Sequence, residues 1–419
     1  MTQEKKHSGT GQDCPKGYKS CDGYRIPKEW HIVRFDSLFS RVTRKNDENN
    51  QNVLTISAQQ GLISQIEYYN TLYASENKTG YTLLHRGDFS YNKSYSSGYA
   101  YGAIKRLDAY EKGIVSPLYL CFTPRQGVNS DFYLQYFEAG CFDREIYKIA
   151  QEGARNHGLL NVSTEDFFHS VLVFPPLEEQ ERITEILTQC DHVIELKEQK
   201  LDELKQLKKE FLRKMFPAKG CDTPEIRFPG FTGAWEQRKL GEIATFINGR
   251  AYSQPELLSS GKYKVLRVGN FYTNDSWYYS DLELGEKYYA DYGDLLYTWS
   301  ATFGPHIWLG DRVIYHYHIW KINLSDQLEK QFAVQLLEQD RTNILSSKNG
   351  STMVHITKEG MEQKDVIIPP STKEQQEIGA FFLQLDNLIT LHQRELEETK
   401  TYKKTLAKLL LTGIVRVQG

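Results

Sequence analysis

The chain has 419 residues, of which 25% are charged, and a formal net charge of −3 at pH 7. Length and composition indicate a globular protein of two to three domains. No stretch of about 18 apolar residues occurs and the first residues are polar, so we expect neither a membrane-spanning helix nor a secretory signal, and a cytoplasmic location. The charge argues against a salt-driven binder of bulk nucleic acid, but a DNA reader with basic groups on one face remains possible.

Two residue types narrow the class further. The six cysteines are scattered without a CxxC pair, which favours reduced thiols over a disulfide framework or a zinc site. The 27 tyrosines, 20 phenylalanines and 6 tryptophans have two interpretations. They are typical of recognition surfaces, and equally of β-rich domains with aromatic cross-strand pairs.

One long unit occurs twice in the chain. Each copy opens with a tryptophan, Trp30 or Trp235, and continues through the same series of short strands and turns. The matched segments are NVLTIS (52–57) with KVLRVG (264–269), RGDFSY (86–91) with YGDLLY (292–297), VLVFPP (171–176) with VIIPP (366–370), and EEQERI (178–183) with KEQQEI (373–378). The spacing between copies changes in the first part of the unit and is constant in the last part. This pattern predicts variable loops in a globular part and a helix of fixed length.

The segments 178–216 and 373–412 carry apolar residues every 3.5 to 3.6 positions. Each follows a Pro-Pro pair, is rich in Glu near its start and Lys near its end, and is stopped by Pro217 or Gly413. Helices this long, with one apolar stripe, need a partner for that stripe. We therefore expect the two helices to pair antiparallel as an intramolecular coiled coil.

These patterns predict an α+β chain with two globular domains, two long antiparallel helices and pseudo-two-fold symmetry. The expected boundaries are a polar, loosely docked tail at 1–26, a first globular domain at 27–176, a helix at 177–216, a Pro- and Gly-rich linker at 217–234, a second globular domain at 235–370, a helix at 371–413 and a C-terminal tail at 414–419. Two unlike domains in one chain could read two unlike half-sites of a DNA duplex, with the helices setting the spacing.

The chain resembles the specificity (S) subunit of type I restriction–modification systems. The resemblance lies in FPPLEEQERITEILTQCDHVIELKEQKLDELKQLKKEFLRKMFP, in IPPSTKEQQEIGAFFLQLDNLITLHQRELEETKTYKKTLAKLLLTG and in RFPGFTGAWEQRKLGEI. It implies two target-recognition domains that read a bipartite, asymmetric site in double-stranded DNA. It also implies partner subunits, a DNA methyltransferase that modifies adenine and a translocating restriction subunit. S-adenosylmethionine, ATP and Mg would then belong to those partners, with no cofactor in this chain.

Motifs of catalysis are lacking in the sequence. There is no GxxxxGK[ST] phosphate loop, no FxGxG, no Asn-Pro-Pro-aromatic motif and no G-x-S-x-G elbow. Two ExK triplets, Glu195–Lys197 and Glu198–Lys200, imitate a nuclease motif, but they lie within a helix rich in charge pairs. His316 and His318 could face one side of a strand as metal ligands, although packed histidines are the more common outcome. We therefore expect a subunit that is not an enzyme, without catalytic residues and without a metal.

Candidate DNA contacts fall at three corresponding places in each copy, chosen because Arg, Lys, Asn and Ser hold phosphates or read base edges. The places are the outward face of the first alternating strand, the loop after the Gly-Asp strand, and the loop before LNVST (160–164) or VHITK (354–358). The residues are Thr55, Ser57, Asn92, Lys93, Ser94, Tyr95, Lys105, Arg106, Arg155, Asn156 and His157 in the first copy, and Arg250, Arg267, Asn270, Thr298, Trp299, Lys348, Asn349 and Ser351 in the second. The alternative is that they are ordinary polar surface residues. Asp88 and Asp294 are expected to cap turns.

Two other classes of function remain as alternatives. The first is a Tyr-rich carbohydrate- or peptide-binding module on a coiled-coil stalk, which would be expected to carry an export signal. The second is a hydrolase with an unrecognised site, for which the sequence offers no motif.

Overall fold

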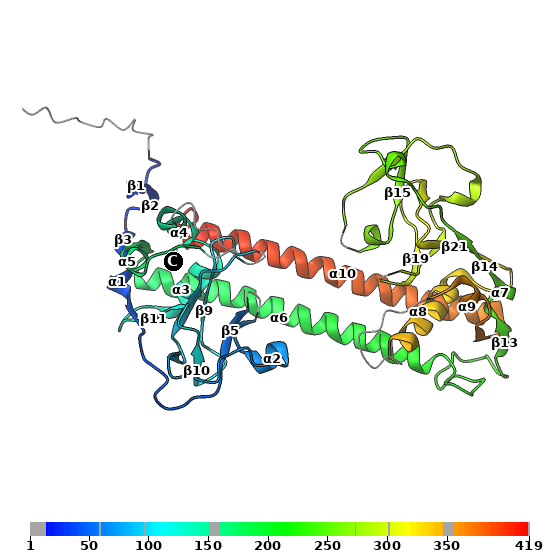
Figure 1. The fold of residues 1–419 in the computed structure, drawn as a ribbon, viewed down its shortest axis with the longest axis horizontal. Coiled ribbons are helices and arrows are strands. Elements are labelled where there is room, and N and C mark those ends of the chain that lie inside the picture. The colour runs from blue at the N-terminus through cyan, green and yellow to red at the C-terminus, as the bar shows by residue number, and fades with distance from the viewer. Residues whose placement is uncertain are drawn as a thin grey trace, which may run out of the picture. The chain divides into compact units, whose positions relative to one another are not determined.

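The structure, a computed structural model, describes residues 14–57, 60–95, 98–150, 160–272, 274–300, 302–346 and 356–417. The chain divides into two compact units (Figure 1). The first comprises residues up to Leu196 together with those from Leu396 onward, and the second comprises Lys197–Glu395. Each unit thus contains one globular part and a stretch of both long helices.

The first unit contains most of the elements of the first repeat. They are β1 (Tyr18–Cys21), β2 (Tyr24–Pro27), β3 (His31–Arg34), α1 (Phe35–Leu38), β4 (Phe39–Arg41), β5 (Leu54–Ser57), β6 (Gly61–Ser64), α2 (Gln65–Tyr69), β7 (Thr82–His85), β8 (Phe89–Asn92), β9 (Ala103–Arg106), β10 (Lys112–Val115), β11 (Leu120–Pro124), α3 (Ser130–Glu138), α4 (Asp143–Ile149), α5 (Thr164–His169), β12 (Val171–Phe174) and the first part of α6 (Leu177–Lys214). Its main sheet has the strand order β4-β11-β8-β9, and all of its pairs are antiparallel.

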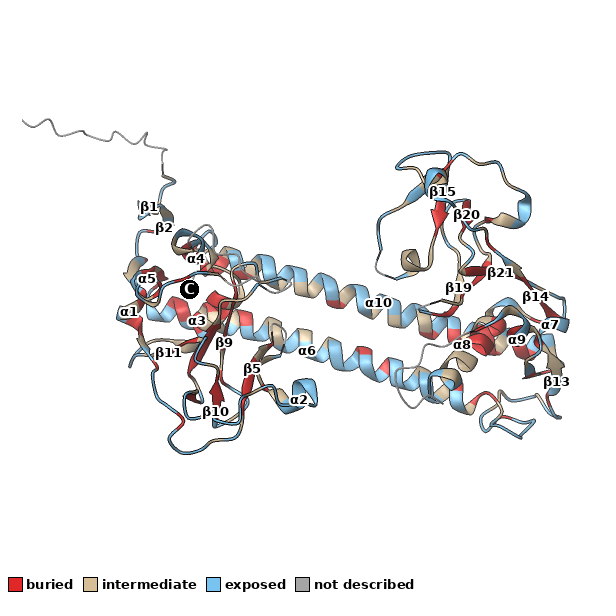
Figure 2. Ribbon diagram, in the orientation of Figure 1, coloured by how far each residue is buried: buried red, intermediate tan, exposed pale blue. Residues whose placement is uncertain are grey.

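The core of the first unit is built around phenylalanines. Phe35, Phe39, Phe89 and Phe122 are fully buried, and their rings meet at centroid distances between 4.9 and 5.9 Å. The buried residues, red in Figure 2, gather on the strands of the globular part and on the helices packed against them. Such aromatic edge and stacking contacts add to the hydrophobic gain of burial.

The N-terminal tail is shorter than expected. The sequence predicts a loosely docked segment up to residue 26, but Tyr18–Cys21 and Tyr24–Pro27 form an antiparallel hairpin. Ile26 at its end is 1% exposed in the main core, so this apolar residue anchors the hairpin. Residues 1–13 lie outside the described part of the chain.

The second unit repeats this architecture. Its elements are the remainder of α6, β13 (Glu236–Lys239), α7 (Leu240–Ile243), β14 (Ala244–Asn248), η1 (Gln254–Glu256), β15 (Tyr263–Leu266), η2 (Val268–Phe271), β16 (Tyr278–Ser280), η3 (Glu286–Tyr288), β17 (Tyr289–Ala290), β18 (Leu295–Thr298), β19 (Gly304–Ile307), β20 (Val313–Tyr315), β21 (Ile319–Leu324), α8 (Lys330–Ser346), α9 (Lys358–Glu362), β22 (Asp365–Ile368) and the first part of α10 (Thr372–Leu411). The sheet order β14-β21-β18-β19 matches that of the first unit, and a second sheet has the order β16-β15-β20-β17.

Both predicted long helices are present. α6 has 38 residues and α10 has 40, and each begins within two residues of a Pro-Pro pair that follows a strand. In the first unit, Ile183 and Leu187 near the start of α6 share a core with Leu410 and Leu411 near the end of α10. Because the start of one helix packs with the end of the other, the pair is antiparallel, as the fold class predicted.

The second unit shows the same antiparallel pairing. Lys197 precedes Lys208 on α6, whereas their partners Glu395 and Asp386 occur in the reverse order on α10. The expected linker at 217–234 is docked against the unit. Trp235, the residue after it, is buried, and its backbone N–H donates to the carbonyl of Asp222 in the linker at 2.7 Å. Within it, Gly220, Pro229 and Gly230 lie in turns.

Candidate DNA-binding interface

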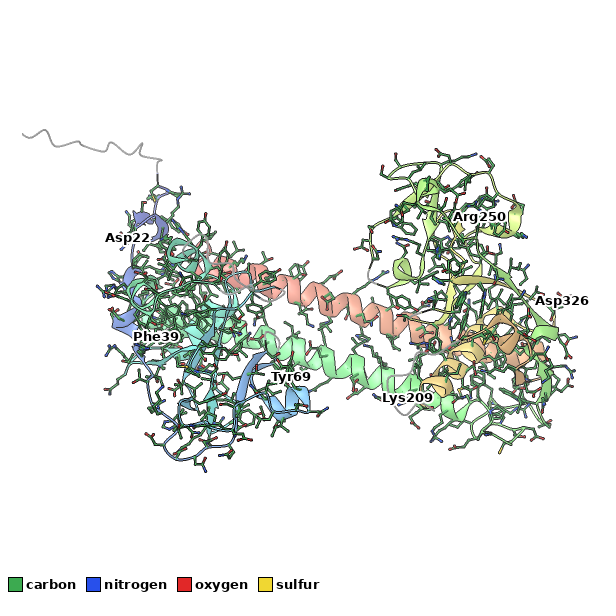
Figure 3. All side chains as sticks on the ribbon, viewed as in Figure 1. Asp22, Phe39, Tyr69, Lys209, Arg250 and Asp326 are labelled. Atoms are coloured by element: carbon green, nitrogen blue, oxygen red, sulfur yellow. The ribbon has the colours of Figure 1, made fainter. Side chains whose placement is uncertain are left out.

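Three segments of the second unit meet at one end of its two sheets. β15 and β20 are parallel and pair Leu266 with Tyr315, which makes the next residues along each strand, Arg267 and His316, neighbours. His316 also pairs with Arg250, which follows β14. Arg250 is labelled in Figure 3 near β15 of Figure 1. Three chain segments that end at this place therefore bring cationic and imidazole side chains together.

The turn between β20 and β21 is fixed by backbone hydrogen bonds. Trp299, which follows β18, donates its backbone N–H to the carbonyl of His318 at 3.1 Å and its indole N–H to the carbonyl of Tyr317 at 2.9 Å. Tyr317 in turn donates its N–H to the carbonyl of Arg250 at 3.0 Å. The side chains of this turn are thus presented on a rigid backbone.

The rings of the turn lie close together. The centroids of Tyr317 and His318 are 3.9 Å apart, those of His316 and His318 are 4.9 Å apart, and Trp299 lies 5.0 Å from His318. We call Arg250, Arg267, Trp299, His316, Tyr317 and His318 the histidine-turn surface. Tyr317 is 39% exposed, so the surface is open at this point.

The two arginines of the surface differ in their partners. Arg250 donates to Glu256 at 2.6 Å and lies over the ring of Tyr252. Arg267 lies 4.2 Å from the ring centroid of Tyr278 and donates only a long bond, 3.4 Å, to the carbonyl of Ser276. No carboxylate pairs with Arg267 within the described ranges, so it retains an uncompensated charge.

Burial keeps the imidazoles of this region neutral. It lowers the pKa of His316 to about 4, with smaller contributions from His318 and Arg267, and it also lowers the pKa of His318. Since both shifts point the same way, both rings are mainly neutral at pH 7. A neutral imidazole offers one hydrogen-bond donor and one acceptor.

The structure brings together four of the predicted contacts of the second copy and separates a fifth. Arg250, Arg267 and Trp299 lie on the histidine-turn surface, and Asn270 is next to it, accepting the backbone N–H of Arg267 at 3.1 Å. Thr298 is wrong as a surface contact, because its side chain is fully buried against the carbonyl of Gly304. It is the last residue of β18, at the centre of a sheet.

The predicted outward face of the first copy's alternating strand is also wrong. Thr55 and Ser57 are buried at 8% and 6% exposure. The neighbours Val53 and Leu54 belong to two different core clusters, so both faces of β5 are covered. The alternation rule assumes that one face meets solvent, and this strand has no such face.

Lys105 and Arg106 lie on strand β9 and not in a loop. Lys105 is buried and donates to Glu138 at 2.6 Å, and Arg106 pairs with Asp131 at 2.6 Å. A buried ammonium requires such a partner, so Lys105 is committed to the fold. Both ion pairs join β9 to α3.

The side chains of the segment after β8 differ in how far they are available to a ligand, and their predicted contact with DNA stays a prediction. Asn92 accepts the backbone N–H of Ser94 at 3.0 Å, and Lys93 donates to the carbonyl of Val162 at 2.7 Å. Tyr95 is 66% exposed and is the side chain of this segment most open to a ligand. The remaining predicted contacts lie outside the described residues: Arg155, Asn156, His157, Lys348, Asn349 and Ser351.

Two expectations about other residues have opposite outcomes. Asp88 and Asp294 cap their turns as predicted, accepting the backbone N–H groups of His85 and Asp291 at 2.7 and 2.8 Å. Aromatic residues in strands were one expectation for the tyrosines, and two Tyr-Tyr pairs differ in this respect: Tyr278 and Tyr279 lie in strand β16, whereas Tyr68 and Tyr69 lie in helix α2. The aromatic residues alone do not determine the element.

Sequence reasoning considered His316 and His318 as packed histidines or as metal ligands, and not as DNA contacts. Within the described ranges, no three His, Cys, Asp or Glu side chains form a group that could hold a metal ion. The sequence did carry a sign that these histidines lie in a turn: the apolar run VIY (313–315) precedes them and the strand-like run IWKINL (319–324) follows them.

None of the described helices combines the length and apolar character needed to cross a membrane.

Comparison with known proteins connects this architecture to one family. The family described as the type I restriction modification DNA specificity domain matches residues 27–206 and again residues 233–401. The type I restriction enzyme MjaVIII specificity subunit of Methanocaldococcus jannaschii is 23% identical, over 96% of this chain and 97% of its own length. The two matched ranges coincide with the two repeats.

Solved structures share the fold. A chain from a structure that describes complex assembly and conformational transition of the type I R-M system has 16% identity and a TM-score of 0.60, covering 94% of this chain and 100% of that one. The type I restriction–modification S subunit from M. genitalium has 14% identity and a TM-score of 0.50, covering 91% of this chain and 96% of that one. At these identities the likeness concerns the fold.

Proposed function

Since the chain belongs to the family of type I restriction–modification DNA specificity subunits, we propose that it reads a two-part, asymmetric sequence in double-stranded DNA, with one globular domain for each half-site. We call residues 27–176 and 235–370 the first and second recognition domains. The chain directs adenine methylation or restriction by its partner subunits and catalyses neither reaction itself. The carbohydrate-binding alternative has no support from the family match.

One observation carries the proposal. The two units have the same sheet order, β4-β11-β8-β9 and β14-β21-β18-β19, but different residues at the ends of the strands. A common scaffold with two different loop surfaces suits a protein that must recognise two different short sequences in the same manner. An identical pair of domains would instead read a symmetric site.

The partners follow from the chemistry that this chain lacks. Its sequence has no loop for nucleoside triphosphate phosphates and no adenine-methylating motif. S-adenosylmethionine, ATP and Mg are therefore assigned to a methyltransferase subunit and a restriction subunit, and these partners also supply part of the phosphate neutralisation that the near-neutral chain does not provide. We place the complex in the cytoplasm, where DNA is accessible to it.

The test is to express the chain with its methyltransferase subunit and map the methylated positions of a genome. The expected result is one motif made of two short specified parts with a fixed unspecified gap. The chain alone, incubated with S-adenosylmethionine and DNA, should transfer no methyl group. Methylation without sequence preference in the complex, or methyl transfer by the isolated chain, would contradict the proposal.

A further inference from the structure

We propose that the turn His316–His318 is the base-reading element of the second recognition domain, and that Arg267 beside it holds a phosphate of the DNA backbone. The inference rests on the proposed function and assigns two different tasks within one surface. It makes Tyr317 and His318 determinants of sequence, and Arg267 a determinant of affinity.

The first argument concerns what holds the turn in place. Its backbone accepts hydrogen bonds from the N–H and indole of Trp299 and from the N–H of Ile319, the last to the carbonyl of His316 at 2.9 Å. It also donates from the N–H groups of His316 and Tyr317 to the carbonyls of Leu266 and Arg250. The side chains of Tyr317 and His318 make no hydrogen bond within the described ranges. A rigid backbone that presents uncommitted polar side chains is the arrangement that a recognition site requires.

The second argument concerns the chemistry of those side chains. Neutral His318 has a donor and an acceptor, and Tyr317 has a hydroxyl that both donates and accepts. Groups of this kind can match the donor and acceptor pattern of base edges in the major groove. Their flat faces, together with that of Trp299, can also stack on an exposed base. The turn therefore carries directional contacts of the kind that distinguish bases.

The third argument separates Arg267 from Arg250. Arg250 is neutralised by Glu256, which leaves it as support for the turn. The guanidinium of Arg267 has only the ring of Tyr278 and one long bond to the carbonyl of Ser276. A buried donor without an acceptor among the described residues occurs in both side chains, Nε of Arg267 and Nη1 of Arg250, so the difference between the two arginines is the carboxylate partner. A planar cation with unused donors is well suited to a phosphate, which accepts two of its N–H groups at once.

The fourth argument comes from the matching position in the first unit. Phe89 pairs with Phe122 there as Leu295 pairs with Ile322 here, so the turns before β11 and β21 correspond. The first unit has Ser116, Pro117 and Leu118 at the turn, and Leu118 is 70% exposed. One turn offers imidazoles and a phenol, and the other offers a hydroxyl and an apolar side chain. Such different chemistry would select different bases in the two half-sites.

The first experiment tests base reading in the complex with the methyltransferase subunit. Tyr317→Ala and His318→Ala are expected to relax one half of the methylated motif, with at least about a tenfold loss of preference at one or two base pairs, and to leave the other half unchanged. The control is Tyr292→Ala. Tyr292 is 74% exposed and precedes β18, whereas Trp299 follows that strand, so the two lie at opposite ends of it.

The outcome is informative in each case. If both alanine variants keep the unmodified motif in both halves, the assignment of the turn is wrong. If a variant unfolds, as judged by its thermal transition, Tyr317→Phe and His318→Phe keep an aromatic ring without the hydrogen-bonding groups and carry the same test. If the unmodified complex shows no two-part motif, the proposed function fails instead, and that failure is recognised before any variant is compared.

The second experiment tests the phosphate contact by its salt dependence. Arg267→Gln is expected to weaken binding to cognate and unrelated DNA by a similar factor, and to reduce the slope of log affinity against log salt by about 1. The methylated motif should not change. Lys262→Gln is the matched control, because Lys262 precedes β15, which Arg267 follows, and is paired with Glu283. An unchanged slope, or a motif altered by Arg267→Gln, would overturn the assignment.

Discussion

Arg227 donates two hydrogen bonds to the buried carboxylate of Glu374, from Nε at 2.7 Å and from Nη2 at 2.8 Å. The indole of Trp235 donates to the same carboxylate at 3.3 Å. In the first unit, Arg416 and Trp30 donate to Glu179 in the same way. Arg227 follows α6 and Arg416 follows α10, so each repeat's Trp–Glu pair is completed by the segment after the other repeat's helix.

This arrangement predicts a large loss of stability in Glu374→Ala. The substitution leaves the indole N–H without an acceptor and the guanidinium with only the backbone carbonyls of Gly233 and Thr232 in place of its carboxylate, which costs about 2–4 kcal/mol in the free energy of unfolding. Urea unfolding followed by tryptophan fluorescence measures the change. Glu203→Ala, which removes an exposed ion pair with Lys200, should change it by less than about 0.5 kcal/mol. Equal effects of the two substitutions would refute the role of the buried carboxylate.

We expect a smaller loss of stability from Asp386→Ala than from Glu374→Ala, because the side chain of Asp386 is more exposed. It accepts Lys208 at 2.5 Å and Gln335 at 3.3 Å, joining α6, α8 and α10. Asp386→Ala removes both bonds, but water can replace part of them, so we expect a loss of about 1 kcal/mol. A double-mutant cycle with Lys208→Ala measures the pairwise part. If the two single effects simply add, the ion pair contributes nothing of its own.

The long helices were predictable because their signal is local. Periodic apolar residues, preceding prolines and the distribution of charge specify a helix without reference to the rest of the chain, and α6 and α10 begin and end within two residues of the predicted segments. The antiparallel pairing followed from the need to cover two apolar stripes. The caps at Asp88 and Asp294 were also local, since an aspartate accepts a backbone N–H of its own turn.

The candidate site was less predictable because it depends on contacts distant in sequence. Nothing in the segment around Thr55 indicates that both faces of its strand are covered, and nothing near Lys105 indicates that Glu138 pairs with it. The position of His316 next to Arg267 depends on a parallel pairing between β15 and β20. Residue types suggested contacts, but the strand register decided which of them meet.

Because His306 is buried, we expect the protein to lose stability on acidification. Burial, with a smaller contribution from Arg341, lowers the pKa of His306 to about 4, and its ring contacts Phe271 and Tyr272. The unfolded chain takes up the proton near pH 6.5 and the folded chain only near pH 4, so stability falls as the pH is lowered between these values. From pH 7 to pH 5 His306 alone is expected to contribute about 2 kcal/mol to the loss, in addition to His316, whose pKa is lowered in the same direction.

Chemical unfolding at a series of pH values checks this expectation. His306→Gln keeps a polar group near Tyr272 but cannot take up a proton, so its stability should depend less on pH by about the same 2 kcal/mol. The control is His192→Gln, whose side chain is 68% exposed on α6 and should leave the pH dependence as it is. A variant of His306 with the unmodified pH dependence would show that another group is responsible.

We expect a substitution at Gly249 to affect both the stability of the strands and the position of the histidine-turn surface. A Cβ at this position would lie 2.3 Å from the carbonyl oxygen of His316 and 2.6 Å from that of Tyr315. Both are backbone atoms, which cannot rotate away, so Gly249→Ala must displace the turn or β14. We expect a loss of about 1–3 kcal/mol in unfolding free energy, together with relaxed recognition of the half-site that Tyr317 and His318 affect. Gly285→Ala, where a Cβ meets no atom within 4 Å, should change neither quantity. If Gly249→Ala lowers stability but keeps the motif intact, the turn does not need its present position to read DNA.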